Sequence, residues 1–437
     1  MKKPVVGLIN HGCPKNLVDA ELMLGMLSDA GFGITLDENK ADIIIINTCS
    51  FIHDAEKESV RSILEIAQTG KKLVITGCLP QKYKKELLKE IPEAVAFIGT
   101  SDIDKIVSVI NSLAKNNSKQ IFEVTSKPAI SYPENVMRQQ ITVGSSSYLK
   151  IAEGCNYKCG YCIIPQLRGP YKSRKIEDIV KEAKWLGDKG VSEIVLIAQD
   201  TSYYGIDIYG EPKLAELLNK LNEIESINWI RVMYTYPSMI NDELIEAFAN
   251  LDKVVKYIDI PLQHSHPDVL KLMNRPQSDY SELIKKLRAK IKGIAIRTTF
   301  IVGYPTENDE HFEHLYNFVK NTKFDKLGVF EYSKEKNTTA YALKPQISSK
   351  IKKERKNKLM ILQKEISKEI HKSLIGKKLP TIIETVNSDG SATGRTYRDA
   401  PEVDGLVYIK TRKNIVPGDI EIVKITAADD YDLYGTV

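Results

Sequence analysis

The chain has 437 residues, which is too long for one ordinary hydrophobic core and favours roughly two to four domains. Hydrophobic residues make up 42% and charged residues 27%, a composition that excludes a disordered tail. No apolar run approaches the about 20 residues that span a bilayer, and no signal peptide is recognisable, so we expect a cytosolic protein without a membrane segment. The net charge of +5 allows contact with nucleic acid but does not indicate it.

Strand and helix patterns alternate through residues 1–118, where β-branched runs are followed by amphipathic stretches. This alternation is typical of a parallel sheet covered by helices, so we predict an N-terminal parallel-sheet α/β domain. Residues 114–140 are rich in polar residues and are predicted as a linker with one strand at 120–124. The strands of the domain are expected at 5–9, 42–46, 73–76 and 95–98, and its helices at 16–29, 54–68, 82–90 and 102–113.

Six further strand candidates follow, each with a loop or a helix behind it. This repetition predicts a central partial (β/α)6 barrel of the TIM type within a domain at 141–371. The domain ends in a basic helix at 349–371, with nine Lys or Arg against three Glu over 350–372. The barrel strands are expected at 148–152, 193–198, 229–234, 257–260, 295–302 and 326–330.

Residues 373–437 form a third region of short β-rich runs separated by turn signals at Asp389-Gly390 and Pro417-Gly418. We predict a small antiparallel β-barrel with strands at 380–385, 405–409, 420–425 and 431–435. This region carries eight basic and ten acidic residues, so its net charge is −2.

Three of the six cysteines, Cys155, Cys159 and Cys162, have the spacing C-x₃-C-x₂-C directly after the first barrel strand. Six cysteines are too few for a disulfide framework in a chain of this length, which favours metal ligands. Three thiolates on one loop can hold three corners of a four-iron cluster and leave the fourth iron open for chemistry. Zinc and a set of buried thiols are alternatives, although no fourth Cys or His lies nearby to close a structural zinc site.

The other three cysteines, Cys13, Cys49 and Cys78, each follow a different strand of the N-terminal sheet. Parallel strands deliver their carboxyl ends to one edge, so these side chains are expected to converge. A second cluster with one open iron accounts for all three. The alternatives are three independent core cysteines, or a zinc site in which His11 joins Cys13.

The C-x₃-C-x₂-C loop, with Tyr161 before its last cysteine, resembles that of the radical S-adenosylmethionine superfamily. Cys13, Cys49 and Cys78, which are far apart in the sequence, narrow this resemblance to the methylthiotransferase family. The resemblance covers essentially the whole chain. One departure is Thr306, where that family would place a glycine after the proline. The segments that resemble the RimO branch in particular are GCPKNLVDAE (12–21), AQDTSYYGIDIYG (198–210), YIDIPLQH (257–264), RTTFIVGYP (297–305) and DAPEVDG (399–405).

The resemblance implies an enzyme that places a methylthio group on the β-carbon of an aspartate in a decoding-centre protein of the small ribosomal subunit. It implies two 4Fe–4S clusters: one on Cys155, Cys159 and Cys162 that binds S-adenosylmethionine, and an auxiliary one on the other trio that holds the sulfur. It also implies a TRAM domain at 373–437, a reductant such as flavodoxin or ferredoxin, and a sulfur donor.

Strand ends of the barrel supply candidates for binding S-adenosylmethionine, because sites on such barrels lie at the carboxyl ends of the strands. Each candidate is about equally well explained as a structural strand-end residue. We assign no catalytic residue beyond the cysteines: His264 is more simply explained by a loop hydrogen bond than as a proton carrier, and Lys15 either stabilises anionic sulfur or is solvated. The candidates are Gln199, Asp200, Arg297, Thr299 and Ser333.

The substrate is predicted to be a basic ribosomal protein because the C-terminal region is net negative, whereas RNA binding draws on Lys and Arg. The related branch that methylthiolates a tRNA adenosine is the first alternative, and the basic helix at 349–371 favours it. An alternative of another class is a non-catalytic iron–sulfur electron carrier or ribosome-binding protein. A simple carrier gains nothing from an open iron.

Overall fold

The computed structural model describes residues 3–50, 53–115, 119–129, 132, 138–141 and 144–437. The predicted linker at 114–140 therefore lies partly outside the described residues. Within the described part, no helix is both long and apolar enough to cross a membrane. The chain divides into two compact units, which we call the first unit (Met1–Val143, Ala152–Tyr157 and Cys162–Lys172) and the second unit (Gly144–Ile151, Lys158–Tyr161 and Ser173–Val437).

The first unit is built on one parallel sheet, as predicted. Its strand order is β2-β1-β3-β4-β5-β6, and every neighbouring pair runs parallel. The central strand β3 is fully buried along its length, which explains its unbroken β-branched run. The strands are β1 (Val5–Asn10), β2 (Gly33–Thr35), β3 (Ile43–Thr48), β4 (Lys72–Gly77), β5 (Ala94–Ile98) and β6 (Ile121–Glu123).

Helices of the first unit begin close to where strands end. The expected helix at 82–90 is broken, because Lys84 takes a left-handed φ of +52°. Short strands β8 (Ala152–Glu153) and β9 (Lys172–Ser173) flank the C-x₃-C-x₂-C segment in the sequence. The helices are α1 (Pro14–Asp29), α2 (His53–Ala67), α3 (Cys78–Tyr83), α4 (Leu87–Glu90), α5 (Ile106–Ala114) and α6 (Ile164–Arg168).

The second unit contains the predicted partial barrel. Its six strands follow the order β14-β13-β12-β11-β10-β7, all neighbouring pairs are parallel, and the sheet does not close on itself. The strands are β7 (Ser146–Lys150), β10 (Glu193–Ile197), β11 (Trp229–Val232), β12 (Val254–Asp259), β13 (Ala295–Val302) and β14 (Lys326–Glu331). The helices between and after them are α7 (Ile176–Asp188), α8 (Ile206–Tyr209), α9 (Leu214–Asn222), α10 (Asp242–Asn250), α11 (Pro267–Leu272), α12 (Tyr280–Lys290), α13 (Asp309–Thr322) and α14 (Thr339–Ala342).

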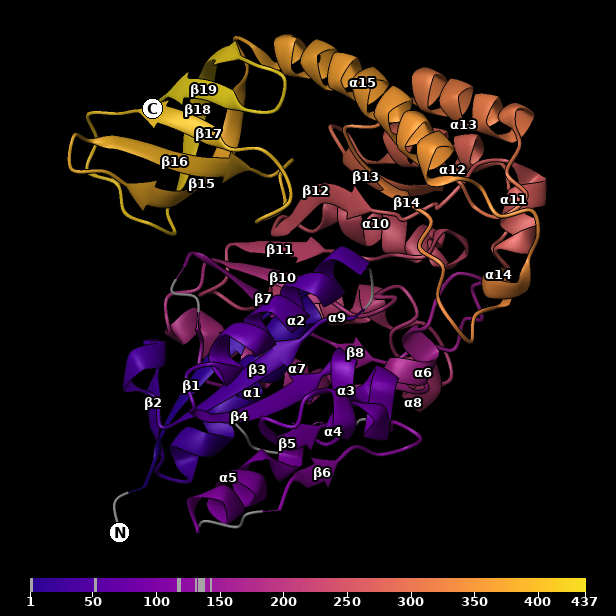
Figure 1. Cartoon of the computed structure of the whole chain (residues 1–437). Helices are drawn as coiled ribbons and strands as arrows, with labels where there is room; N and C mark the ends of the chain where they lie inside the picture. The colour runs from indigo at the N-terminus through magenta and orange to yellow at the C-terminus, as the bar shows by residue number, and fades with distance from the viewer. Residues whose placement is uncertain (1–2, 51–52, 116–118, 130–131, 133–137, 142–143) are drawn as a thin grey trace. The chain divides into compact units, whose positions relative to one another are not determined.

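The long basic helix α15 (Ser349–Leu374) leads from this barrel into a small closed barrel of five strands at the C-terminus (Figure 1). The small barrel is antiparallel as predicted except for one pair, since β17 and β19 run parallel. The sequence pattern also missed β16, whose residues are small or polar and form no apolar β-branched run. The strands are β15 (Lys378–Val386), β16 (Ser391–Thr396), β17 (Val407–Lys410), β18 (Ile420–Ala428) and β19 (Leu433–Thr436).

The loop after β16 joins the small barrel to the edge strand β7 and the inner strand β12 of the larger one. Tyr148 on β7 donates a hydrogen bond from its hydroxyl to Glu402 at 3.1 Å, and Tyr257 on β12 donates one to Asp404 at 2.7 Å. Both acceptors belong to the DAPEVDG segment at 399–405. These hydrogen bonds tie the segment to the larger barrel, although Glu402 itself remains exposed.

A buried charge cluster lies beside that loop. Glu193, at the start of β10, pairs with Arg231 at 2.7 Å and with Arg395 at 2.6 Å, and all three side chains are at most 1% exposed. Arg395 also pairs with Glu384, whose side chain is 27% exposed. A buried carboxylate shared by two guanidiniums ties the two barrels together, because removing it leaves positive charges in the interior.

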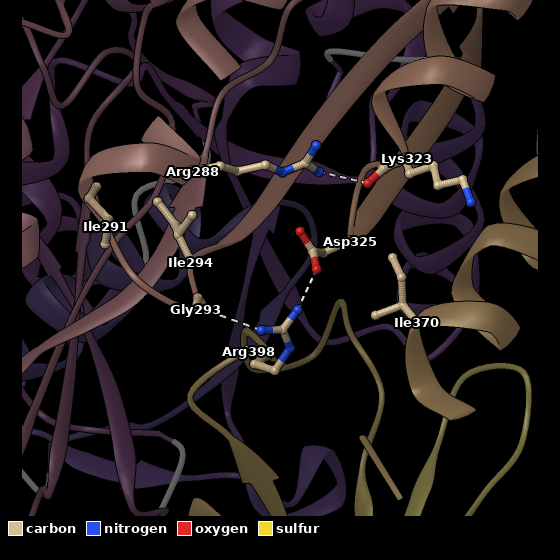
Figure 2. A pocket seen from close by; sticks show the side chains of 8 residues that line it. All are labelled: Arg288, Ile291, Gly293, Ile294, Lys323, Asp325, Ile370 and Arg398. Atoms are coloured by element: carbon tan, nitrogen blue, oxygen red, sulfur yellow. Dashed lines mark hydrogen bonds and ion pairs between the residues drawn. The ribbon is translucent and has the colours of Figure 1, made fainter. Parts of the chain in front are cut away.

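A pocket of about 330 Å³ opens at the amino ends of β13 and β14 (Figure 2). Arg398, from the loop after β16, points across it to Asp325 and donates a hydrogen bond to the Gly293 carbonyl at 3.0 Å. The cysteine loop instead follows the carboxyl end of β7. Since the amino end of such barrels serves stability, we assign this pocket to the junction of the two barrels and not to catalysis.

Glu193→Gln tests the charge cluster. Burial alone would raise the pKa of Glu193, but Arg395 and Arg231 lower it from 4.5 to about 2. Its stabilising contribution is therefore complete above pH 4.5 and lost as the pH falls toward 2. We expect the variant to lose about 3–5 kcal/mol of unfolding free energy at neutral pH, and to show a weaker pH dependence in this window, in chemical denaturation. Glu384→Gln is the matched control with a smaller expected loss, and equal losses would contradict the assignment.

Candidate functional site

Three cysteines of the first unit lie at the carboxyl edge of its sheet. Cys13 follows β1, Cys49 comes directly after β3, and Cys78 comes directly after β4. These strands are adjacent in the sheet, so their ends lie side by side. The side chains differ in exposure: Cys13 is exposed, whereas Cys49 and Cys78 are buried. The backbone thus places all three cysteines at one edge of the sheet, and Cys13 is the one exposed to solvent.

Two glycines allow the loops at this edge to approach one another. Gly12 has a φ of +103°, and a Cβ there would lie 2.7 Å from the Cβ and 3.2 Å from the Sγ of Cys49. Gly77 has a φ of +95°, and a Cβ there would lie 2.5 Å from the side-chain oxygen of Asn47. Only glycine combines this conformation with so little space.

Polar side chains fix the same loops. Asn16, at the start of α1, donates hydrogen bonds to the carbonyls of His11 at 3.1 Å and Thr48 at 3.0 Å. The backbone N–H of Cys49 donates to the Ser59 hydroxyl at 3.0 Å. The loops that carry Cys13 and Cys49 are thus held by side chains as well as by the sheet.

Arg168, at the end of α6, reaches this site from the segment that follows the C-x₃-C-x₂-C motif. Its guanidinium pairs with Asp19 at 2.6 Å and with Glu153 at 3.1 Å, and all three side chains are buried. It also donates to the side-chain oxygen of Asn16, and at 3.8 Å to the sulfur of Cys78. The buried guanidinium therefore contacts the Cys78 sulfur, two carboxylates, and the Asn16 side chain that holds the loops of Cys13 and Cys49.

The surroundings of Cys78 make its thiol harder to ionise. Burial raises its pKa, the Arg168 guanidinium lowers it, and the nearby Cys13 raises it again, with a net upward shift. A metal centre must displace this proton, and the guanidinium then faces a thiolate.

The ligand atoms of the trio are not gathered as tightly as those of a single-ion site. Zinc–sulfur bonds of about 2.3 Å put the sulfurs of a tetrahedral site roughly 3.8 Å apart. Among the described residues of the first unit, no three metal-ligating groups approach within 4.8 Å of one another. Nδ1 of His11 lies 3.5 Å from a carboxylate oxygen of Glu58.

The C-x₃-C-x₂-C cysteines are all half-buried. In the first unit, the N–H of Cys155 donates to the Gly169 carbonyl at 3.1 Å, and Ile163 packs on Cys78. In the second unit, the N–H of Gly160 donates to the Met273 carbonyl at 2.8 Å, and a Cβ on Gly160 would meet the Tyr304 hydroxyl at 2.6 Å. The loop is anchored on both sides of Cys159.

Four of the five candidates for S-adenosylmethionine binding lie at or beyond the carboxyl halves of barrel strands. Gln199 and Asp200 follow β10, Thr299 lies on β13 and Ser333 follows β14. One oxygen of Asp200 accepts hydrogen bonds from the N–H groups of Ser202 at 2.9 Å and of Tyr203 at 3.2 Å, so it also shapes its own loop.

Arg297 stands apart from these four. It is the third residue of β13, and its guanidinium pairs with Asp259 at 2.9 Å. Asp404 of the DAPEVDG segment lies 3.9 Å away. Its contacts are those of a structural ion pair inside the barrel, although its role toward S-adenosylmethionine stays a prediction.

Sequence reasoning missed a second buried network, at the loop after β13. Glu307 accepts hydrogen bonds from the N–H of Gly303 at 2.9 Å and from Arg355 of α15 at 2.7 Å. His264 is fully buried 3.6 Å from Glu307, and its Nδ1 accepts the loop hydrogen bond expected of it, from the N–H of His266 at 3.0 Å. Thr306 has a φ of +73°, which explains why the family would favour glycine there.

Comparison with protein families matches three segments of the chain. Residues 6–99 match an uncharacterized protein family designated UPF0004, residues 149–319 the radical SAM superfamily, and residues 375–437 the TRAM domain.

Similar proteins of matching length are known. A protein of Caldanaerobacter subterraneus subsp. tengcongensis is 50% identical over 98% of this chain and 99% of its own length. A protein of Thermoanaerobacter sp. strain X514 is 48% identical over 98% of this chain and 99% of its own length. A protein of Synechocystis sp. is 46% identical over 99% of this chain and 97% of its own length. Each is named ribosomal protein uS12 methylthiotransferase RimO.

Two solved structures share the fold at low identity. The radical S-adenosylmethionine methyltransferase TsrM from Kitasatospora setae, with cobalamin and a 4Fe–4S cluster bound, aligns with a TM-score of 0.56 at 14% identity over 78% of this chain and 74% of its own. The cobalamin-dependent S-adenosylmethionine radical enzyme OxsB aligns with a TM-score of 0.51 at 13% identity, over 84% of this chain and 56% of its own.

Arg168→Met tests the buried cation. The substitution leaves Asp19 and Glu153 buried without their guanidinium, so we expect a loss of about 3–5 kcal/mol in the unfolding free energy of the first unit. Arg168→Lys keeps the charge but not the forked geometry and should lose less. Chemical denaturation of the metal-free chain measures both. Equal losses for the two variants would show that the charge is not what stabilises the site.

Proposed function

We infer that this chain, which belongs to the RimO family of ribosomal protein uS12 methylthiotransferases, attaches a methylthio group to the β-carbon of an aspartate in ribosomal protein uS12. It is a radical S-adenosylmethionine transferase that uses S-adenosylmethionine and an iron–sulfur cluster. The observation that carries the proposal is the trio Cys13, Cys49 and Cys78 at one sheet edge of a chain whose relatives match it from end to end.

The six cysteines have two separate tasks in this proposal. Cys155, Cys159 and Cys162 hold the 4Fe–4S cluster whose open iron binds S-adenosylmethionine, because their close spacing on one loop supplies three thiolates and no fourth. Cys13, Cys49 and Cys78 hold an auxiliary 4Fe–4S cluster, whose open iron holds the sulfur to be transferred. Arg168 supports the second task by placing a positive charge against the Cys78 sulfur.

The cluster and S-adenosylmethionine together supply the one-electron chemistry that opens an unactivated C–H bond. The protein must hold the target carbon in place and keep water out. Gly160, packed under the Tyr304 hydroxyl, and Glu307, which ties the loop after β13 to α15, keep the walls of the barrel mouth rigid. The candidates Gln199, Asp200, Thr299 and Ser333 lie at the same end of the barrel strands and are proposed to contact S-adenosylmethionine.

The proposed partner is basic. The C-terminal barrel carries a net charge of −2, which favours encounter with a ribosomal protein over RNA. Three of its ten acidic residues lie in the DAPEVDG segment, where Glu402 is exposed and keeps its charge while it accepts the Tyr148 hydrogen bond. A small one-electron carrier such as flavodoxin or ferredoxin is proposed as the reductant.

Single cysteine variants separate the two tasks. In the reduced, anaerobically reconstituted enzyme, we expect Cys159→Ala to abolish cleavage of S-adenosylmethionine to 5′-deoxyadenosine. Cys49→Ala should retain at least part of this cleavage and abolish sulfur insertion. Chromatography of the nucleoside and mass spectrometry of the product measure the two reactions. If both variants lose only sulfur insertion, the assignment of the trios is wrong.

The substrate is tested by supplying uS12 and tRNA in the same reaction. We expect the methylthio mass to appear on an aspartate-containing peptide of uS12 and not on a tRNA nucleoside. The Cys49→Ala enzyme is the matched control, because it should modify neither. A mass gain on tRNA alone would reject the protein substrate.

A further inference from the structure

Two histidine rings meet on the second unit, away from the cysteines in sequence and outside every role described above. His266 is the residue before α11, and His311 lies in the first turn of α13. Their ring centroids are 4.3 Å apart, with the rings tilted by 44°. Asp268, in the first turn of α11, brings a carboxylate to the same place, with one oxygen 4.0 Å from Nδ1 of His266. The residues come from the loops after two adjacent barrel strands, β12 and β13.

The three side chains offer one ligand atom each, and these atoms all lie within 4.8 Å of one another. Among the described residues, this is the group of three metal-ligating side chains that meets that distance. Its chemistry differs from that of the thiol trios: two imidazoles and one carboxylate suit a single divalent first-row ion. Both rings are half-buried and Asp268 is exposed, so an ion can enter from solvent.

We propose that His266, Asp268 and His311 form a binding site for one divalent transition-metal ion, Zn²⁺ in the first instance. Three protein ligands leave a coordination position for water. A bound ion links the start of α11 to the start of α13, and so joins the loop that carries His264 to the loop that carries Glu307. The ion therefore stiffens the carboxyl end of the barrel and takes no part in the radical chemistry.

The hydrogen bonds that the two histidine rings already make limit how tightly the site can bind a metal ion. Nδ1 of His266 accepts a hydrogen bond from the N–H of Asp268 at 3.2 Å, and Nδ1 of His311 accepts one from the N–H of Asn308 at 3.3 Å. A neutral ring that accepts at Nδ1 carries its proton on Nε2. An ion that binds at Nε2 of a ring must displace the Nε2 proton, and an ion that binds at Nδ1 must displace the backbone hydrogen bond. Both hydrogen bonds are long for N–H donors and hence weak. His314, whose ring centroid is 5.1 Å from that of His266, packs beside that ring.

The test is equilibrium dialysis of the anaerobically reconstituted holoenzyme against Zn²⁺, with zinc and iron counted in the same sample. We expect His311→Ala and His266→Ala each to bind one zinc ion per chain fewer than the wild type, with unchanged iron. Asp268→Asn keeps the shape of the site and should weaken zinc binding by about tenfold or more, because losing a direct carboxylate ligand costs at least as much as losing an outer partner of a ligand. His53→Ala, an exposed histidine at the start of α2, is the matched control and should bind as the wild type does.

Equal zinc in the wild type and in His311→Ala would overturn the proposal, as would the same loss in His53→Ala. Circular dichroism of each variant shows that it has folded. The result does not depend on the cluster assignments, because any zinc taken up by vacant thiols is common to the wild type and to every variant and cancels in the comparison.

Discussion

Parallel strands deliver their carboxyl ends to one edge of a sheet, and this constraint brings together cysteines that are far apart in the sequence. Cys13, Cys49 and Cys78 each follow one of three adjacent strands. Gly12 and Gly77 remove the side chains that would keep the loops apart. Because the edge supplies three thiols and not four, a cubane cluster held there has one iron without a protein ligand. The proposed chemistry depends on that open position.

One residue brings a buried positive charge to the site. Arg168 contacts two carboxylates, an amide and the sulfur of Cys78, all in the interior of the first unit. Arg168 lies six residues after Cys162, the last cysteine of the C-x₃-C-x₂-C motif. The segment that follows this motif therefore also stabilises the loops that carry Cys13, Cys49 and Cys78. In the second unit, Glu193 plays a comparable part between two guanidiniums and joins the small barrel to the large one.

Most of the fold could be predicted, because buried parallel strands have long β-branched runs and the intervening helices have clear periodicity. β2 and β16 were missed, since a strand of three residues and a strand of small polar residues leave no such signal. The placement of Cys13, Cys49 and Cys78 at one sheet edge could be predicted from strand ends alone. Arg168 could not, because its contact with Asn16 joins residues 152 positions apart. Arg297 became a candidate for binding S-adenosylmethionine because sites on such barrels lie at the carboxyl ends of strands. In the structure it is the third residue of β13, and its side chain pairs with Asp259.

The central claim is that each trio of cysteines holds its own four-iron cluster, and an iron count with Mössbauer spectroscopy tests it most directly. The account predicts about eight iron atoms per reconstituted chain, and about four when Cys13, Cys49 and Cys78 are all replaced by serine. The remaining spectrum should be that of one 4Fe–4S cluster. A wild-type chain with about four iron atoms, or a triple variant that loses none, would contradict it.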